Sequence, residues 1–377
     1  MDILKFFDIF IKDINEESYL ENKPLFIFVD ESQYAHNWAL VGKIIYDEIK
    51  NVFMIFTGSN ALNLESNKDA ARRALKKEIY PLSFYEYLNL KYNYEIPKNL
   101  EESFKKLILN GDISNLEKIE KNFALNVLMD LKIDPKKKRM EKFYPIGELS
   151  STLNRSESET TQLTLAMKDR IIEKDIDIIK SFNGNIKITS YSLLNIISLE
   201  KPGTLSLEKL ANSLNISKKT VNNLISTFED TQLIFHVEPY ASPIKRIRKP
   251  WEYYFLSTQI KSWIYQQSGQ ASRNNEYFGL LLENFVGASL FKFKQKSRMN
   301  FGIFFDGEKE GVDFLINTID GKIIPIEVGI GKKNKRQISK AIKRYDSSHG
   351  IIISNKIKSI KKEDNIILIP PITFSLL

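Results

Sequence analysis

The sequence has 377 residues, and its 42% of hydrophobic residues is typical of a globular protein with about two to four domains. It contains no cysteine, which excludes disulfides and thiolate sites. It contains only 3 histidines, which argues against a zinc enzyme. The formal net charge is +8, which favours anionic partners and nucleic acid first among them.

No long uncharged apolar segment is present, so we expect no transmembrane helix. The first residues, MDILKFFDIFIKDINEE, carry acids among the apolar side chains and no small-residue cleavage site, unlike a signal peptide. Together with the absence of cysteine, this favours a cytoplasmic protein without a membrane partner.

Residues 25–29 are five apolar residues in a row, followed directly by Asp30 and Glu31. Such a run predicts a strand buried on both faces of a parallel sheet. The two acids have two interpretations of similar weight. In one, Ser32 or Asp30 caps the helix that follows. In the other, one acid holds Mg²⁺ beside a nucleotide and the next orients the attacking water.

The stretch HNWALVGKIIYDEIK predicts an amphipathic helix, and NVFMIFTGSN predicts a second buried strand. Strand, helix and strand over this length indicate a right-handed parallel unit. Because parallel strands end on the same side, the polar residues after the second strand should lie beside Asp30 and Glu31. These residues are Thr57, Gly58, Ser59 and Asn60. An ordinary glycine-containing turn is the alternative interpretation.

Further along, AARRALKKEIYPLSFYEYL places two arginines after these strands. An arginine near a phosphate site can stabilise charge in transfer, and the alternative is a solvated helix face. The block VDESQ, FTGSN and ARRALKKEIYPLSFYEYL resembles the prokaryotic AAA+-type ATPases that carry a winged helix and a nuclease-like domain. The resemblance implies ATP and Mg²⁺, with Asp30 and Glu31 as Walker B acids. It also implies Ser59 and Asn60 in the sensor region, followed by Arg73.

The sequence departs from this family at its phosphate-binding loop. The pattern G-x-x-x-x-G-K-[ST], whose amides cradle phosphates, does not occur. Gly329-Ile330-Gly331-Lys332-Lys333 comes nearest but lacks the first glycine and the hydroxyl residue. In the family the loop precedes the Walker B strand by tens of residues, and only 24 residues precede Leu25 here. We therefore expect the family's first strand, its phosphate-binding loop and the helix after that loop to be absent.

The stretch SLEKLANSLNISKKTVNNLISTFEDTQLI predicts two short helices at a tight angle, with Ser217 as the N-cap of the second. The apolar positions that support them are Leu207, Leu210, Ala211, Leu214, Ile216, Val221, Leu224 and Phe228. The outer face carries residue types that contact phosphates and base edges. They are Lys218, Lys219, Asn222 and Asn223.

A hairpin-like stretch follows, FHVEPYASPIKRIRKPWEYYFLS. Its turn carries Lys245, Arg246, Arg248 and Lys249. Two helices and a basic hairpin indicate a winged helix, for which we predict DNA contact. The alternative is a module that packs against other protein.

The last hundred residues place Glu283 in a helix, YFGLLLENFVGASLF, and Asp313 and Glu327 in the strands GVDFLI and KIIPIEVG. This resembles the PD-(D/E)XK nuclease fold, which implies Mg²⁺ held by the two strand acids with help from the helix acid. The turn at Asp320-Gly321 predicts that the two strands pair as a hairpin and present their acids on one face, with Glu283 approaching it.

The resemblance also implies a lysine two residues after the second strand acid. That position is Gly329, and Lys332 or Lys333 are the nearest lysines that follow it. We therefore expect this domain to bind metal with little or no cleavage, because a positive charge at the reacting phosphate is lacking.

These observations predict an α/β protein of four regions. They are a truncated AAA+-like region at 1–92, a helical lid or linker at 93–199, a winged helix at 200–268 and a nuclease-like domain at 269–377. The leading interpretation is an AAA+-family ATPase-like protein associated with DNA, without ATP turnover in this chain. The alternatives are a Mg²⁺-dependent nuclease and a non-enzymatic DNA-binding or scaffolding protein. DNA and other protein subunits are the expected partners.

Overall fold

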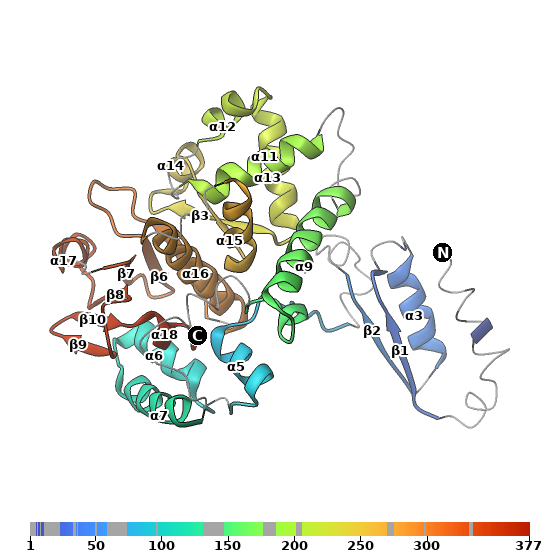
Figure 1. Ribbon diagram of the computed structural model, residues 1–377, viewed down its shortest axis with the longest axis horizontal. Helices are drawn as coiled ribbons and strands as arrows, with labels where there is room; N and C mark the ends of the chain where they lie inside the picture. The colour runs from blue at the N-terminus through green and yellow to red at the C-terminus, as the bar shows by residue number, and fades with distance from the viewer. Residues whose placement is uncertain are drawn as a thin grey trace. The chain divides into compact units, whose positions relative to one another are not determined.

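The computed structural model of the chain contains two compact units, Met1–Ile79 and Tyr80–Leu377 (Figure 1). The residues that it describes are 5, 7, 9–10, 23–32, 35, 37–49, 51–58, 74–95, 97–130, 147–175, 186–200, 206–269, 275–297, 299–331 and 335–377. The first unit ends before residues 80–92, which the sequence assigned to the amino-terminal region. These residues belong to the second unit.

The first unit contains two parallel strands, β1 (Leu25–Val29) and β2 (Val52–Phe56), joined through α3 (Trp38–Glu48). The predicted strand–helix–strand unit is therefore present. Leu25, Ile27, Val52 and Met54 pack toward Val41 and Ile45 of α3, and the alternate residues point away from this cluster.

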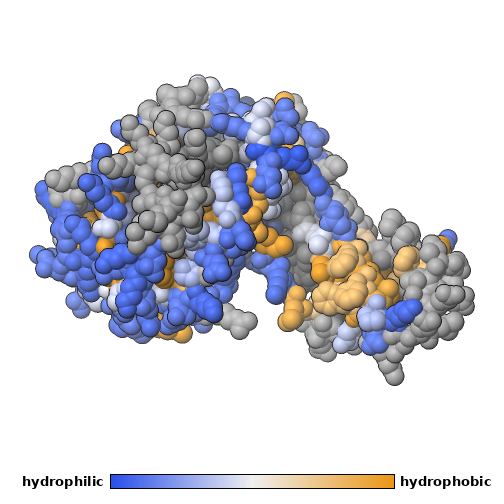
Figure 2. All heavy atoms as spheres, turned by 60° about the horizontal axis from the view of Figure 1, so that its bottom comes forward, coloured by the Kyte–Doolittle hydropathy of each residue, from blue (hydrophilic) through white to orange (hydrophobic). Residues whose placement is uncertain are grey.

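The outer face of this sheet is exposed, contrary to the prediction of strands buried on both faces. Phe26 and Phe28 are 63% and 68% exposed, and Phe53 and Ile55 lie beside them on β2. Figure 2 shows hydrophobic residues gathered on this unit. Continuous apolar runs are typical of strands buried on both faces, yet in the described part of the chain one face of this pair remains exposed.

The second unit begins with helices and continues as alternating helices and strands. Its helical elements up to the main sheet are α5 (Phe84–Tyr92), α6 (Leu100–Asn110), α7 (Ser114–Asp130), η4 (Ser150–Thr152), α9 (Glu157–Arg170), η5 (Ile171–Asp175), α11 (Ile186–Leu199), α12 (Leu207–Leu214) and α13 (Lys218–Asp230). The later helices are α14 (Pro243–Arg248), α15 (Thr258–Gln267), α16 (Asn275–Lys296), α17 (Lys335–Arg344) and α18 (Pro371–Phe374). The described part of 93–199 is thus mainly helical, as predicted.

Eight strands form one mixed sheet in the order β4-β3-β5-β6-β7-β8-β10-β9. Their bounds are β3 (Ile234–Pro239), β4 (Glu252–Phe255), β5 (Phe301–Phe305), β6 (Phe314–Thr318), β7 (Ile323–Gly329), β8 (Gly350–Ser354), β9 (Lys361–Glu363) and β10 (Ile366–Ile369). The chain is therefore of mixed α/β class, with one small parallel sheet and one large mixed sheet.

Side-chain alternation gives the large sheet two apolar faces. Ile324, Ile326 and Val328 of β7 belong to the core that α16 covers, together with the helices α5 to α7. Ile323 belongs to the core on the other face, against Ile338 of α17. Both faces are thus covered by helices.

Strand β3 joins the helix–turn–helix region to the carboxyl-terminal region. Its first residues pair with β4 in antiparallel register, and Glu238 and Pro239 pair with Phe304 and Phe305 of β5 in parallel register. The sheet therefore crosses the predicted boundary between residues 268 and 269. A separate core made by α11 to α13 packs behind the β3–β4 pair.

Candidate functional site

The ends of β1 and β2 meet, as predicted for parallel strands. The hydroxyl of Thr57 donates a hydrogen bond to the carboxylate of Asp30. The backbone N–H and the hydroxyl of Ser32 both donate to the carbonyl oxygen of Thr57, at 2.8 Å each. An exposed carboxylate at the tip of two parallel strands has the oxygen chemistry that Mg²⁺ prefers.

The helix-cap interpretation of Asp30 and Ser32 is wrong. Helix α3 begins at Trp38 with Asn37 at its N-cap, and no side chain caps it. Glu31 instead adopts a left-handed backbone conformation with φ of 52°, which turns the chain at the end of β1. The acids therefore belong to a turn between the strand and the helix. The predicted sensor residues Ser59 and Asn60 and the predicted Arg73 lie outside the described residues.

Helices α12 and α13 form the predicted helix–turn–helix arrangement. Asn215 ends α12 in the left-handed conformation, and the hydroxyl of Ser217 accepts a hydrogen bond from the N–H of Thr220 at 3.1 Å. Leu210, Val221 and Leu224 are buried between the helices. The short turn, the Ser217 cap and the buried apolar residues together fix the start of α13 relative to α12.

The predicted contact residues of α13 differ in exposure. Lys218, Lys219 and Asn222 are exposed, whereas Asn223 is half-buried. Lys218 also forms an ion pair with Glu208 of α12 at 3.3 Å, which is weak because both side chains are solvated. The structure therefore brings two lysines and one amide to the outer surface of α13.

The basic connection between β3 and β4 contains a helix, α14, where the sequence predicted a hairpin turn. The two strands pair in antiparallel register as predicted. Pro243 is the first residue of α14, where its fixed φ and missing N–H favour a helix start. The basic residues are therefore distributed around a helix rather than along a loop.

Arg246, predicted as a DNA contact, is half-buried and engaged within the protein. Its Nε donates to the carbonyl oxygen of Ala241 at 2.7 Å, and its guanidinium lies 4.3 Å from the centre of the Phe304 ring. Trp251 donates to the carbonyl oxygen of Arg246 at 3.2 Å. Arg246 thus anchors α14 to the sheet, while Lys245, Arg248 and Lys249 are exposed.

In the carboxyl-terminal region the predicted hairpin is present. β6 and β7 pair in antiparallel register, with Gly321 at φ of +79° in the turn. The pairing of Phe314 with Ile326 continues to place Asp313 opposite Glu327. The Asp313 carboxylate accepts the N–H of Val328 at 2.5 Å, so it lies beside the backbone of the Glu327 strand.

Glu283 contacts a group that the sequence did not predict. The Tyr254 hydroxyl lies 3.2 Å from the Glu283 carboxylate and 2.9 Å from that of Glu252. Burial raises the pKa of Glu252 to about 8, with further contributions from the negative charges of Glu283 and Asp313. Glu252, Glu283 and Asp313 therefore form one acidic cluster.

Lys261 of α15 adds a cation to this cluster. It is 1% exposed, and its ammonium has no hydrogen-bond partner within the part of the chain that the structure describes. Burial lowers its pKa to about 8, and the charge of Glu283 acts in the opposite direction. Neither Glu252 nor Lys261 stood out in the sequence, because each lies in a different strand or helix and only the fold brings them together.

Glu327 is buried on β7. The register of the hairpin places it opposite Asp313, so the two strand acids share one face of the sheet. Among the residues that the structure describes, no three His, Cys, Asp or Glu side chains are arranged to hold a metal ion. The predicted joint metal site of Glu283, Asp313 and Glu327 thus has no ready-made geometry. Lys332 and Lys333 lie outside the described residues.

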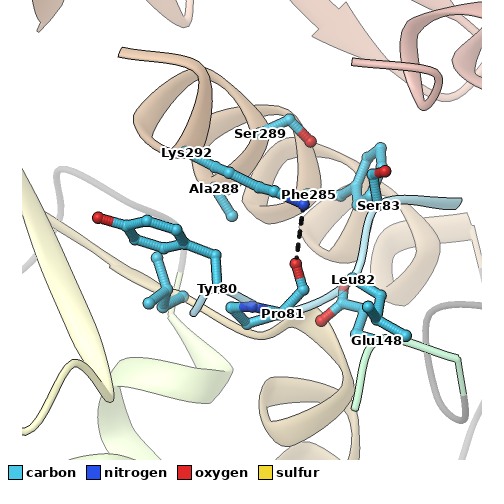
Figure 3. Close-up of a pocket in the computed structure, with 10 residues that line it drawn as sticks. Tyr80, Pro81, Leu82, Ser83, Glu148, Phe285, Ala288, Ser289 and Lys292 are labelled. Atoms are coloured by element: carbon cyan, nitrogen blue, oxygen red, sulfur yellow. Dashed lines mark hydrogen bonds between the residues drawn. The ribbon is translucent and has the colours of Figure 1, made fainter. Parts of the chain in front are cut away.

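A small cavity lies between residues 80–83 and α16 (Figure 3). Its volume of about 20 Å³ is enough for one water molecule and too small for a nucleotide. Lys292 donates to the carbonyl oxygen of Pro81 at 3.1 Å and forms an ion pair with Glu86. This cavity therefore marks a packed junction rather than a ligand site.

The comparison with protein families assigns an AAA domain to residues 2–88. It also assigns residues 151–271 and 278–373 to two domains of unknown function, DUF8612 and DUF4143. None of the helices that the structure describes is both long enough and apolar enough to cross a bilayer.

Two relatives from Methanocaldococcus jannaschii match over most of the chain. The protein named Uncharacterized protein MJ1637 is 35% identical over 371 residues, which are 98% of this chain and 73% of the relative. Uncharacterized protein MJ1544 is 26% identical over 330 residues, which are 84% of this chain and 64% of that relative. The chain therefore belongs to the same protein family as MJ1637, and the AAA domain at its amino terminus makes this an AAA-like ATPase family.

Proposed function

We propose that this chain is a DNA-contacting protein of the AAA-like ATPase family, which holds duplex DNA through α13 and α14. The observation that carries this proposal is the outward orientation of Lys218, Lys219 and Asn222 on α13 and of three cations on α14. Arg246 and Trp251 fix α14 to the sheet, so its cations are presented from an anchored support. The arrangement of two helices and an antiparallel pair supports a winged helix.

Replacing Lys245, Arg248 and Lys249 together with alanine is expected to weaken duplex DNA binding about tenfold or more. Each phosphate contact releases counterions, so the slope of log affinity against log salt should also fall, by up to about 3. Fluorescence anisotropy with a labelled duplex measures both quantities. The matched control replaces three exposed lysines elsewhere, Lys98, Lys118 and Lys294. Equal affinity and slope in the two triple variants would contradict the α14 contact.

The family in general uses ATP and Mg²⁺, and the exposed Asp30 carboxylate at the ends of β1 and β2 supports the assignment of Asp30 and Glu31 to such a role. The sequence contains no G-x-x-x-x-G-K-[ST] loop, so we infer that this chain by itself does not turn over ATP. Steady phosphate release that disappears in Glu31→Gln would refute this inference.

A Mg²⁺-dependent nuclease is the second candidate, favoured by the position of Asp313 opposite Glu327 in the β6–β7 hairpin. The glycine at position 329, where a positive charge is expected, counts against efficient cleavage. Divalent-dependent nicking of DNA that is lost in Glu327→Ala would make the nuclease the leading function instead.

A further inference from the structure

The positive charge of the chain is concentrated in one segment near its carboxyl end. Residues 332–364 contain eleven Lys or Arg residues and three Asp or Glu residues, an excess of eight cations. This excess equals the formal net charge of +8 for all 377 residues. Summed over the rest of the sequence, the formal charges cancel. A basic partner-binding surface should accordingly be sought in this segment as well.

The fold displays these cations on the outside of the large sheet. Helix α17 buries Ile338, Ala341 and Ile342 against the sheet. Its opposite side carries four exposed cations, Lys335, Arg336, Lys343 and Arg344. An α-helix of ten residues is about 15 Å long, so these cations extend over several phosphate spacings.

The connection from β8 to β9 adds a second row of cations. Ile357 and Ile360 pack this connection against the core, and the neighbouring Lys356 and Lys358 are exposed. Gly331, shortly before α17, donates to the side chain of Asn355 at 2.9 Å. The start of α17 and the β8–β9 connection therefore lie side by side. We call the exposed cations of α17, of the connection and of β9 the α17–β9 surface.

Only part of this surface is neutralised by acids. Glu363 forms ion pairs with both Lys335 and Lys361. Glu310 pairs with Lys340, and Asp306 pairs with Arg344. In contrast, Lys343, Lys356 and Lys358 form no ion pair with any residue in the described part of the chain. Three exposed lysines without acidic partners favour the binding of an anionic partner.

We propose that the α17–β9 surface binds the sugar–phosphate backbone of duplex DNA without reading its sequence. The proposal rests on the proposed function, contact with DNA, and adds a second binding surface to it. Lysines are flexible point charges suited to phosphates. Two such surfaces on one folded unit would engage a longer stretch of backbone than α13 and α14 alone.

Two features of the surface favour duplex DNA over other polyanions. Among the described residues of 335–364 the only aromatic rings are Tyr345, which packs on Tyr240, and the buried His349, so no ring is free to stack on an unpaired base. The described residues of the same segment include no exposed large apolar side chain of the kind that inserts into a membrane surface. A duplex, which presents its phosphates outward, matches a surface of this composition.

The test compares three variants of the full chain on a labelled duplex between about 50 and 200 mM salt. The surface variant replaces Lys343, Lys356 and Lys358 with alanine, the second variant is the α14 triple variant, and the third is the Lys98, Lys118 and Lys294 control. All these side chains are exposed, and thermal unfolding checks that each variant folds. We expect the surface variant to lose affinity about tenfold or more and to lower the salt slope by up to about 3.

The outcomes separate this inference from the proposed function. If the α14 variant binds weakly and the surface variant binds like the control, the α17–β9 surface is overturned and the proposed function stands. If the surface variant alone binds weakly, the surface stands and the α14 contact fails. Tighter binding to a single strand of equal length, or binding to anionic lipid vesicles without binding to the duplex, also overturns the inference. A wild-type chain that does not bind duplex DNA overturns both proposals.

Discussion

Replacing Asn284 with alanine is expected to lower the free energy of unfolding by about 4 kcal/mol, because two buried backbone groups lose their partner. The Asn284 side chain is fully buried, and its amide accepts the N–H of Phe255 and donates to the carbonyl oxygen of Phe255, at 2.9 Å each. Phe255 ends β4, the edge strand of the large sheet. The Asn284 side chain thus provides, for the backbone of Phe255, the two hydrogen bonds that a further strand beside β4 would provide.

Urea unfolding followed by circular dichroism measures this effect. The matched control is Asn212→Ala, because Asn212 is exposed on α12 and its removal should change the free energy of unfolding by less than about 0.5 kcal/mol. Similar losses in both variants would show that β4 does not depend on Asn284. A large loss confined to Asn284→Ala would show that the folded chain depends on the bonds between α16 and β4.

Replacing Glu148 with glutamine is expected to remove a pH dependence of stability. Glu148 is 3% exposed, and its carboxylate accepts the Ser257 hydroxyl at 2.8 Å and the N–H of Gln259 at 3.0 Å. Burial raises the pKa of Glu148 from 4.5 to about 7, although these hydrogen bonds act in the opposite direction. The folded chain therefore retains a proton on Glu148 at pH values where the unfolded chain has released it.

The sign of the effect follows from this difference in pKa. A carboxyl group whose folded pKa is raised favours folding at low pH, and its contribution is lost as the pH rises from 4.5 to about 7. The loss for such a shift is about 3 kcal/mol. Glutamine keeps an acceptor oxygen and cannot ionise, so Glu148→Gln should gain about 3 kcal/mol relative to the wild type between pH 4.5 and pH 8.

The measurement is the free energy of unfolding in urea at both pH values for the two proteins. Other titrating groups are common to both, so they cancel in the comparison. Glu102→Gln, in an exposed position on α6, is the control for the substitution itself. Parallel stability curves for wild type and Glu148→Gln would show that Glu148 is ionised in the folded chain.

The sequence by itself determined the local elements and the chemistry that they carry. Apolar runs set β1 and β2, and their polar ends met at Asp30 and Thr57 as parallel strands require. Ser217 capped α13, and Asp320-Gly321 formed a hairpin turn. These features depend on neighbours within a few residues, for which side-chain spacing and turn chemistry are sufficient. The AAA domain was recognisable for the same reason, since its motifs are short and contiguous.

Tertiary structure alone decided which of these residues act together. The Arg246 side chain donates to the carbonyl oxygen of Ala241 and lies over the ring of Phe304, whereas the neighbouring basic residues of α14 are exposed. Glu252 and Lys261 joined Glu283 through packing of a strand and two helices. Burial and electrostatic pairing depend on segments far apart in the chain. A pattern of residue types cannot specify those distances, because the same local pattern is compatible with either face of a strand or helix until another element covers one.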